Sequence, residues 1–272
     1  MARWDWYQAT VRGLGQSAHD LVLSGLVHGL DLVSVVPSRA MHGYLHGAEV
    51  RRGSSVLSRV WWGGNPGVHV QATGEHSPEV ARVLRQHWPV HAVTRCDASQ
   101  DWDEPGLFGR MADVLLAYAA DRGIRIDQQG DWHRGEARTL YLGARSSSVQ
   151  LVLYEKGYQV GAGAPLGWVR LEVRVRPVGD ARERVALWEP DQAFGASAWL
   201  VEALQLLGWD HLVKRSVGTV WRPADDQRAR LALVRQYSAT LAGWIAEAGG
   251  LDAWWGEFVS SSRGEAVHSP QP

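Results

Sequence analysis

Segments with the two-residue period of β-strands alternate with segments of helical period through the first two-thirds of this 272-residue chain. Alternating apolar and polar side chains are typical of strands that bury one face only. Such strands are expected over residues 3–11, 42–50, 54–62, 67–74, 90–101, 137–145, 148–157 and 167–177. Helices are expected over residues 15–29, 77–88 and 106–121. The pattern predicts an α+β fold, with a mainly antiparallel, curved β-sheet core and packed helices.

The pattern changes after Pro177 and predicts a helical C-terminal part. Residues 193–208 and 225–249 carry helical apolar stripes, whereas the end of the chain is small and polar. We therefore expect a core domain over residues 1–180, a helical C-terminal subdomain over residues 186–259 and a disordered tail over residues 260–272. The sequence shows no internal repeat at a fixed period.

Composition excludes several classes of protein. No apolar run is long enough for a membrane span, and the first residues lack the pattern of a signal peptide, so a cytoplasmic location without membrane association is expected. The single cysteine, Cys96, excludes an intramolecular disulfide and cysteine-rich zinc sites. The formal net charge of −1 lacks the basic excess of many nucleic-acid binders. Basic residues nevertheless outnumber acidic ones between Arg134 and Arg176, so any phosphate-binding surface must be local.

The segment "TRCDASQDWD" places charges at alternating positions of an expected strand. Arg95, Asp97, Ser99 and Asp101 would share one face. The two aspartates would lie roughly 13 Å apart along a straight strand, too far to share one ion unless the strand bends between them. Termination of the strand by acidic residues is the competing interpretation, and the pattern alone favours it.

The segment "GWVRLEVRVRP" has an apolar face and a charged face that carries one glutamate among arginines. Glu172 could form an ordinary cross-strand ion pair. It could instead be a ligand of a hard cation such as Mg²⁺ or Mn²⁺, which prefers oxygen ligands. Nothing local decides between the two interpretations.

The segment "LYEKG" places a tyrosine two residues before one of only two lysines in the chain. On one strand face, Tyr154 and Lys156 would set a phenol beside a cation, and a nearby divalent ion would favour the ionised phenol. A solvent-facing Tyr and Lys on an edge strand is the plain alternative.

Taken in order, five segments resemble the trans-acting rolling-circle replication initiators, a family that includes plasmid initiators, filamentous-phage replication proteins and nicking relaxases of conjugative elements. The segments are "DWYQATV", "TRCDASQD", "TLYLGARSS", "LYEKG" and "WVRLEVRV". The likeness spans residues 5–177, with a further similar stretch at residues 219–241. This family manages without a His-x-His motif, and the chain contains none.

The resemblance implies an enzyme, a metal-dependent DNA endonuclease and strand transferase, with residues 1–180 as its catalytic domain. A tyrosine would attack a phosphodiester at the origin, keep the 5′ phosphate and release a 3′ hydroxyl for priming. The implied nucleophile is Tyr154, with Tyr141 and Tyr158 as rivals. The implied ligands of Mg²⁺ or Mn²⁺ are Asp97, Asp101 and Glu172. The implied roles for basic residues are charge stabilisation by Lys156 and Arg95, and phosphate binding by Arg138, Arg145, Arg170 and Arg174.

The resemblance also implies partners and leaves alternatives open. Origin DNA, single-stranded or extruded as a hairpin, would be the substrate, a homodimer is expected, and a host helicase would unwind the duplex because the chain lacks an ATP-binding loop motif. Val152 and Ser99 depart from the family pattern. A conjugative relaxase with the same chemistry, a non-catalytic DNA-binding regulator and a scaffolding protein remain alternatives.

Overall fold

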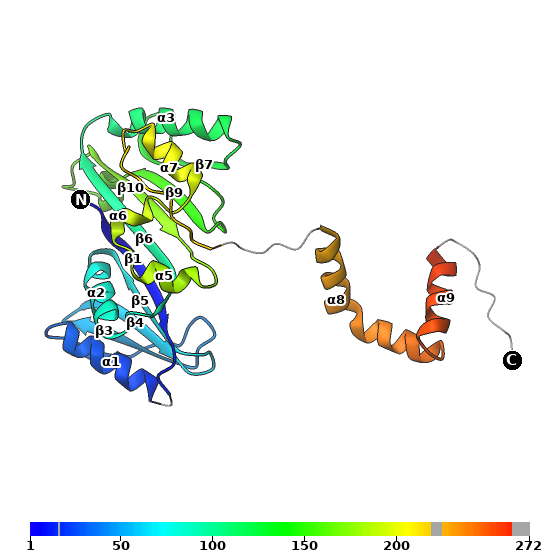
Figure 1. Cartoon of the computed structure of the whole chain (residues 1–272). Coiled ribbons are helices and arrows are strands. Elements are labelled where there is room, and N and C mark those ends of the chain that lie inside the picture. Colours follow the sequence, from blue (N-terminus) through cyan, green and yellow to red (C-terminus); the bar gives the residue numbers. More distant parts are fainter. Residues whose placement is uncertain (16, 219–224, 263–272) are drawn as a thin grey trace. The chain divides into compact units, whose positions relative to one another are not determined.

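The computed structural model describes residues 1–15, 17–218 and 225–262, and the chain divides into two compact units, Met1–Thr219 and Val220–Pro272. The first unit is built on one antiparallel sheet (Figure 1) with the strand order β2-β3-β4-β5-β1-β6-β10-β9-β8-β7. The strands are β1 (Arg3–Val11), β2 (Ser34–Pro37), β3 (His46–Arg52), β4 (Ser55–Trp62), β5 (Val68–Thr73), β6 (Ala92–Asp103), β7 (Ile126–Asp131), β8 (Glu136–Leu142), β9 (Val149–Glu155) and β10 (Trp168–Val175).

The helices described in this unit are α1 (Ala18–Gly29), α2 (Ser77–His87), α3 (Leu107–Asp121), the short α4 (Lys156–Val160), α5 (Ala181–Ala186), α6 (Pro190–Ala193) and α7 (Ala198–Gln205). Apart from α4, they cover one face of the sheet. All except α4 contribute buried residues to one hydrophobic core with the strands. The opposite face of the sheet carries the polar side chains. The observed architecture confirms the predicted α+β fold with an antiparallel sheet and C-terminal helices.

The sheet consists of two halves with the same topology. In the first half a strand, β1, is followed by a helix and by four strands, the last of which, β5, returns to pair with β1. In the second half β6 is followed by α3 and by four strands, the last of which, β10, returns to pair with β6. The two leading strands, β1 and β6, pair with each other at the centre. The halves therefore meet in an approximately two-fold arrangement.

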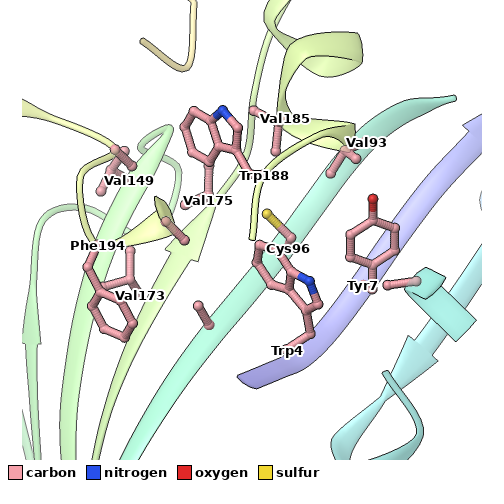
Figure 2. Close-up of a cluster of buried hydrophobic side chains, with 14 of the residues drawn as sticks. Trp4, Tyr7, Val93, Cys96, Val149, Val173, Val175, Val185, Trp188 and Phe194 are labelled. Atoms are coloured by element: carbon pink, nitrogen blue, oxygen red, sulfur yellow. The ribbon is translucent and has the colours of Figure 1, made fainter. Parts of the chain in front are cut away.

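One cluster of buried side chains lies where α5 and α6 pack against the central strands (Figure 2). Trp4 and Tyr7 of β1 lie there beside Val93 and Cys96 of β6. Val173 and Val175 of β10, with Val185, Trp188 and Phe194 from the α5–α6 region, complete the cluster. Phe194 and Leu200 belong to the segment that the sequence grouped with the C-terminal helices, and both are buried in this core. The division into residues 1–180, 186–259 and 260–272 stays a prediction.

Local sequence explains where several elements begin. Pro78 occupies the first turn of α2, where its missing amide hydrogen is not needed, and Glu79 complements the helix dipole there. The side chain of Ser197 caps α7 by accepting a hydrogen bond from the amide of Leu200. Two strands were not expected from the sequence, β2 and β7. Both are exposed edge strands, so they lack the one-sided apolar alternation on which the prediction rests.

The second unit contains α8 (Asp225–Glu247) and α9 (Leu251–Ser262). These helices contact each other through Trp244, Trp254 and Phe258. Of the predicted tail, residues 260–262 belong to α9, whereas residues 263–272 lie outside the described residues. None of the helices in the described part of the chain combines the length and apolar character that a membrane crossing requires.

One buried histidine is held neutral beneath the central strands. The Nδ1 atom of His91 lies 2.7 Å from the carbonyl oxygen of Trp88, which can only accept, so Nδ1 carries the proton. The hydroxyl of Tyr7 then donates to Nε2 over 2.6 Å. Burial, assisted by the Arg85 guanidinium, lowers the pKa of His91 from 6.5 to about 4. Tyr7 can therefore donate to Nε2 only while the ring is uncharged.

We predict that this histidine destabilises the fold in acid. The pKa of His91 is lower in the folded than in the unfolded chain. Neutral His91 therefore makes its full contribution to the free energy of unfolding above pH 6.5, and this contribution is lost as the pH falls towards 4. The full loss is about 3 kcal/mol. Urea unfolding at pH 7 and pH 4.5 should show a smaller pH-dependent drop for His91→Gln than for the wild-type chain. An equal drop in both proteins would contradict the assignment.

Candidate active site

The polar face of β6 and β10 carries charged side chains that alternate in sign across the strands. Directly opposite residues of an antiparallel pair point to the same side. Arg170 lies opposite Asp101, Arg174 opposite Asp97, and Glu172 opposite Ser99. Cross-strand pairing therefore accounts for much of the charge pattern in these segments.

A cleft of about 440 Å³ opens on this face over β9, β10, β6 and β1. Its floor contains Asp97 and Glu172, and Tyr154 and Lys156 line it from β9 and the start of α4. Arg95 borders it from β6. The structure thus brings together the predicted nucleophile, both predicted charge-stabilising residues and two of the three predicted metal ligands.

Two of the carboxylates that line the cleft, those of Asp97 and Glu172, are almost completely buried, and each faces a guanidinium. Arg95 Nε donates to Asp97 Oδ1 over 2.9 Å, and Arg174 Nε donates to Glu172 Oε1 over 2.6 Å. Arg174 Nε also lies 3.9 Å from Asp97 Oδ2, so it links the two acids. Burial raises the pKa of Asp97, and the neighbouring Glu172 adds to this effect while Arg95 opposes it. The cleft therefore holds a carboxylate that accepts a proton more readily than usual.

The phenol of Tyr154 is neutral and hydrogen-bonded to Glu172. Its Oη donates to Glu172 Oε2 over 3.3 Å. Burial raises the pKa of Tyr154 well above its usual value, and the Glu172 carboxylate raises it further. Attack by this phenol on an electrophile therefore requires a base, and Glu172 is placed to accept the proton.

Lys156 lies beside this phenol, although it does not belong to the strand as expected. The strand β9 ends at Glu155 and Lys156 is the first residue of α4. Its Nζ lies 5.7 Å from the centre of the Tyr154 ring and donates to Gln159 Oε1 over 2.7 Å. Burial lowers the pKa of Lys156, and the Arg170 charge contributes. Gly157 permits the turn, since a Cβ there would lie 2.1 Å from the Pro165 carbonyl oxygen.

Asp101 lies outside the cleft. The strand β6 pairs regularly with β10 from Cys96 to Asp103, so no bend brings Asp101 towards Asp97. Instead Asp101 accepts two hydrogen bonds from Arg170, of 2.6 and 2.8 Å. Burial opposes ionisation of Asp101, but the Arg170 guanidinium outweighs it and lowers the pKa of that carboxyl.

The predicted DNA-contacting arginines separate into two groups. Arg170 is 2% exposed and bound to Asp5 and Asp101, and Arg138 is paired with Glu155 and stacked on Phe108. Arg145 and Arg174, by contrast, line a neighbouring cleft of about 610 Å³. Tyr141 and Arg174 line both clefts, so the two hollows share a border.

Both rival tyrosines also line this cleft, the candidate active-site cleft. Tyr141 Oη donates to Gln129 over a long 3.4 Å, and its ring lies 5.7 Å from the Arg174 guanidinium carbon. Tyr158 is 36% exposed. Neither has a hydrogen bond to a cleft carboxylate among the described residues, and this distinguishes Tyr154.

Sequence analysis missed two cleft residues, Asp5 and Trp6. A β-bulge shifts the register of β1 between Trp4 and Trp6, so Trp4 is buried in the core whereas Trp6 reaches the cleft. Regular alternation would place both on one face and Asp5 on the other with Tyr7. Arg95 stacks 4.3 Å above the Trp6 ring. The bulge removes the periodic signal that could have identified these residues.

The three predicted metal ligands are not gathered into one group in the described part of the chain. No group of three or more His, Cys, Asp or Glu side chains there is arranged to hold a metal ion. Asp97 and Glu172 are two carboxylates in one cleft, and Mg²⁺ is commonly bound by one or two carboxylates together with substrate phosphates. Burial is the main cause of the raised pKa of Asp97, and the nearby Glu172 charge adds to it.

Comparison with known proteins identifies a solved structure that is similar to this chain. The chain is similar to the rolling circle replication initiator protein from Geobacillus stearothermophilus, with a TM-score of 0.45 and 23% sequence identity. The similarity covers 64% of this chain and 74% of that chain. No protein-family model and no curated protein matches the sequence.

We predict that Arg170 is needed for stability. Arg170→Met would leave Asp5 and Asp101 without their shared cation, and should lower the free energy of unfolding by about 3 kcal/mol. Arg134→Met removes an arginine whose side chain is 75% exposed and should change it by less than about 1 kcal/mol. Urea denaturation measures both. Equal stability of Arg170→Met and the wild-type chain would contradict the role.

Proposed function

We propose that the chain is a DNA strand transferase that nicks origin DNA to initiate rolling-circle replication. The ordered sequence motifs support this proposal, and the observation that carries it is the Tyr154 hydroxyl hydrogen-bonded to Glu172 inside the cleft. In the proposed reaction Tyr154 Oη bonds to phosphorus as the bond to the 3′ oxygen breaks. The 5′ phosphate stays on tyrosine, and the 3′ oxygen takes up a proton to become a primer hydroxyl. Reversal with a 3′ hydroxyl rejoins the strand.

The neighbouring side chains supply the proton transfers and the charge. Glu172 accepts the phenolic proton over its 3.3 Å contact. Lys156 forms no ion pair with the described residues, so its ammonium is available to bind a phosphate oxygen or to protonate the departing 3′ oxygen. Arg95 stabilises the charge that develops on the phosphate and keeps its orientation through Trp6 and Asp97.

We further propose that a divalent cation, Mg²⁺ or Mn²⁺, binds at Asp97 and Glu172. When bound it would polarise a non-bridging phosphate oxygen and favour the ionised phenol. Asp101 could act as a third ligand only if it left Arg170. We therefore propose phosphate oxygens of the substrate as the remaining ligands of the cation. Arg145 and Arg174 are the proposed phosphate contacts on the side of the neighbouring cleft.

The proposed partners follow from the reaction. Single-stranded or extruded hairpin DNA at the origin would be the substrate, and a host helicase would unwind the duplex. A homodimer and a cytoplasmic location are part of the same proposal. A conjugative relaxase would share the chemistry and differ in the DNA site that it cleaves.

We predict that Tyr154→Phe abolishes nicking. The wild-type chain, incubated with Mn²⁺ and supercoiled DNA that carries its own origin, should nick the DNA and leave a covalent protein–DNA adduct that survives denaturation. Tyr154→Phe should form neither product while retaining its fold, whereas Tyr141→Phe and Tyr158→Phe should retain both. Loss of the adduct in one of these two variants would move the nucleophile there. DNA binding without cleavage under all metal conditions would favour the non-catalytic regulator.

We also predict that nicking depends on the two cleft carboxylates. Glu172→Gln and Asp97→Asn should each lower the nicking rate by about 10²- to 10⁴-fold, since one removes the base and both remove a charge that binds the cation. Asp113→Asn, on the exposed side of α3, is the matched control and should nick normally. Single-turnover assays across a Mn²⁺ titration measure both effects. A wild-type rate in EDTA would refute the metal proposal and leave the tyrosine chemistry standing.

A further inference from the structure

A separate cleft of about 660 Å³ opens on the same polar face over the first half of the sheet. It is called the second cleft because it lies apart from the two adjoining hollows around Tyr141. Gln8 and Thr10 of β1 and His69 of β5 form its floor. Tyr44 and His42 approach from the loop before β3, and Arg12 and Arg182 also line it. The register places Thr10 opposite His69 and Gln8 opposite Arg95, so this floor and the active-site cleft share one face of the sheet.

A directed chain of hydrogen bonds fixes the polar floor. Trp6 Nε1 can only donate, and it donates to Gln8 Oε1 over 3.1 Å. The Gln8 amide nitrogen then donates to His69 Nε2 over 2.7 Å. Burial lowers the pKa of His69 to about 4, with a smaller contribution from His42, so the ring is neutral and its proton lies on Nδ1. Nδ1 donates to Thr10 Oγ1 over 2.9 Å. These hydrogen bonds fix the donor and acceptor atoms of the polar floor. The series of hydrogen bonds begins at the Trp6 ring, which also lines the active-site cleft.

The aromatic side chains of Tyr44 and His42 line the second cleft beside this polar floor. The Tyr44 ring lies nearly parallel to the His69 ring, with 5.7 Å between their centres and an angle of 21°. Tyr44 is half-buried and His42 is exposed, so ring surface faces the cleft. Flat aromatic surface beside fixed hydrogen-bonding groups is suited to the π-face and polar edge of an unpaired nucleobase.

The charge of this cleft differs from that of the active-site cleft. Among the described residues its lining includes Arg12 and Arg182 but no carboxylate. Arg182 uses Nε to donate to the Pro177 carbonyl oxygen, which orients the guanidinium. The cleft therefore attracts a phosphate without first losing an internal ion pair.

The two clefts occupy corresponding places in the two halves of the sheet. The second cleft lies over β1 and β5 and is bordered by the β4–β5 connection at Asn65. The active-site cleft lies over β6 and β10 and is bordered by the β9–β10 connection at Lys156. Along β1, Trp6 and Thr10 are roughly 13 Å apart. One extended strand of nucleic acid could therefore span both clefts.

We propose that the second cleft binds an unpaired base of the DNA strand whose phosphodiester enters the active-site cleft. The base stacks on Tyr44 and its phosphate contacts Arg12 and Arg182. This inference rests on the proposed nicking function, and it assigns to the non-catalytic half of the sheet the task of holding the strand in register.

The test uses a single-stranded oligothymidine of about twelve nucleotides with one photoreactive 5-iododeoxyuridine. Fluorescence anisotropy measures its Kd for the full chain, and ultraviolet cross-linking followed by peptide mapping locates the modified base. We expect a cross-link at Tyr44 or His42 and an increase in Kd of about 5- to 150-fold for Tyr44→Ala. Tyr44→Phe retains the ring and should bind like the wild-type chain. Thermal unfolding of each variant checks that the fold is intact.

The outcomes separate this inference from the proposed function. Wild-type affinity of Tyr44→Ala, or cross-links that map only elsewhere, would overturn the base site, and origin nicking by the wild-type chain would still support the proposed function. A wild-type chain that neither binds the oligonucleotide nor nicks origin DNA would overturn both. Matching losses in Tyr44→Ala and Tyr44→Phe would assign the effect to the hydroxyl and overturn stacking.

Discussion

The buried guanidinium of Arg170 ties together the centre of the sheet. It projects from β10, binds Asp101 of β6 through two hydrogen bonds, and reaches past that strand to Asp5 at the bulge of β1. A charge so deeply buried is tolerated only when it is fully paired. Regular pairing of β6 with β10 already keeps Asp101 apart from Asp97, and Arg170 neutralises Asp101 in that position. The same guanidinium binds Asp5 at the border of the cleft.

The repeated topology gives a physical reason for the position of the active-site cleft. Each half offers a leading strand and a returning strand with a connection that can border a hollow on the polar face. The cleft in the second half is lined by carboxylates, a tyrosine and a lysine, whereas the cleft in the first half is lined by imidazole, amide and phenol groups. The backbone arrangement is shared, while the side chains differ. A repeat of this kind leaves no fixed period in the sequence.

Sequence periodicity predicted the elements that bury one face, and it failed where burial or pairing departs from that rule. The strands around Asp97, Glu172 and Tyr154 were identified from their strand-like sequence patterns, and these three residues line one cleft. Asp5 and Trp6 were missed because a bulge breaks the period. The ion pair between Arg170 and Asp101 could not be foreseen from spacing alone, since it depends on the register between β6 and β10. Register is decided by the whole sheet.

The charge balance of the active-site cleft bears on its chemistry. Arg95 faces Asp97 and Arg174 faces Glu172, so both guanidiniums are already neutralised by a buried acid. An entering phosphodiester would add a negative charge beside two carboxylates, with Lys156 as the cation that no described carboxylate occupies. Protonation of Asp97, or a divalent cation bound at Asp97 and Glu172 as proposed, would reduce the repulsion between the phosphodiester and these carboxylates.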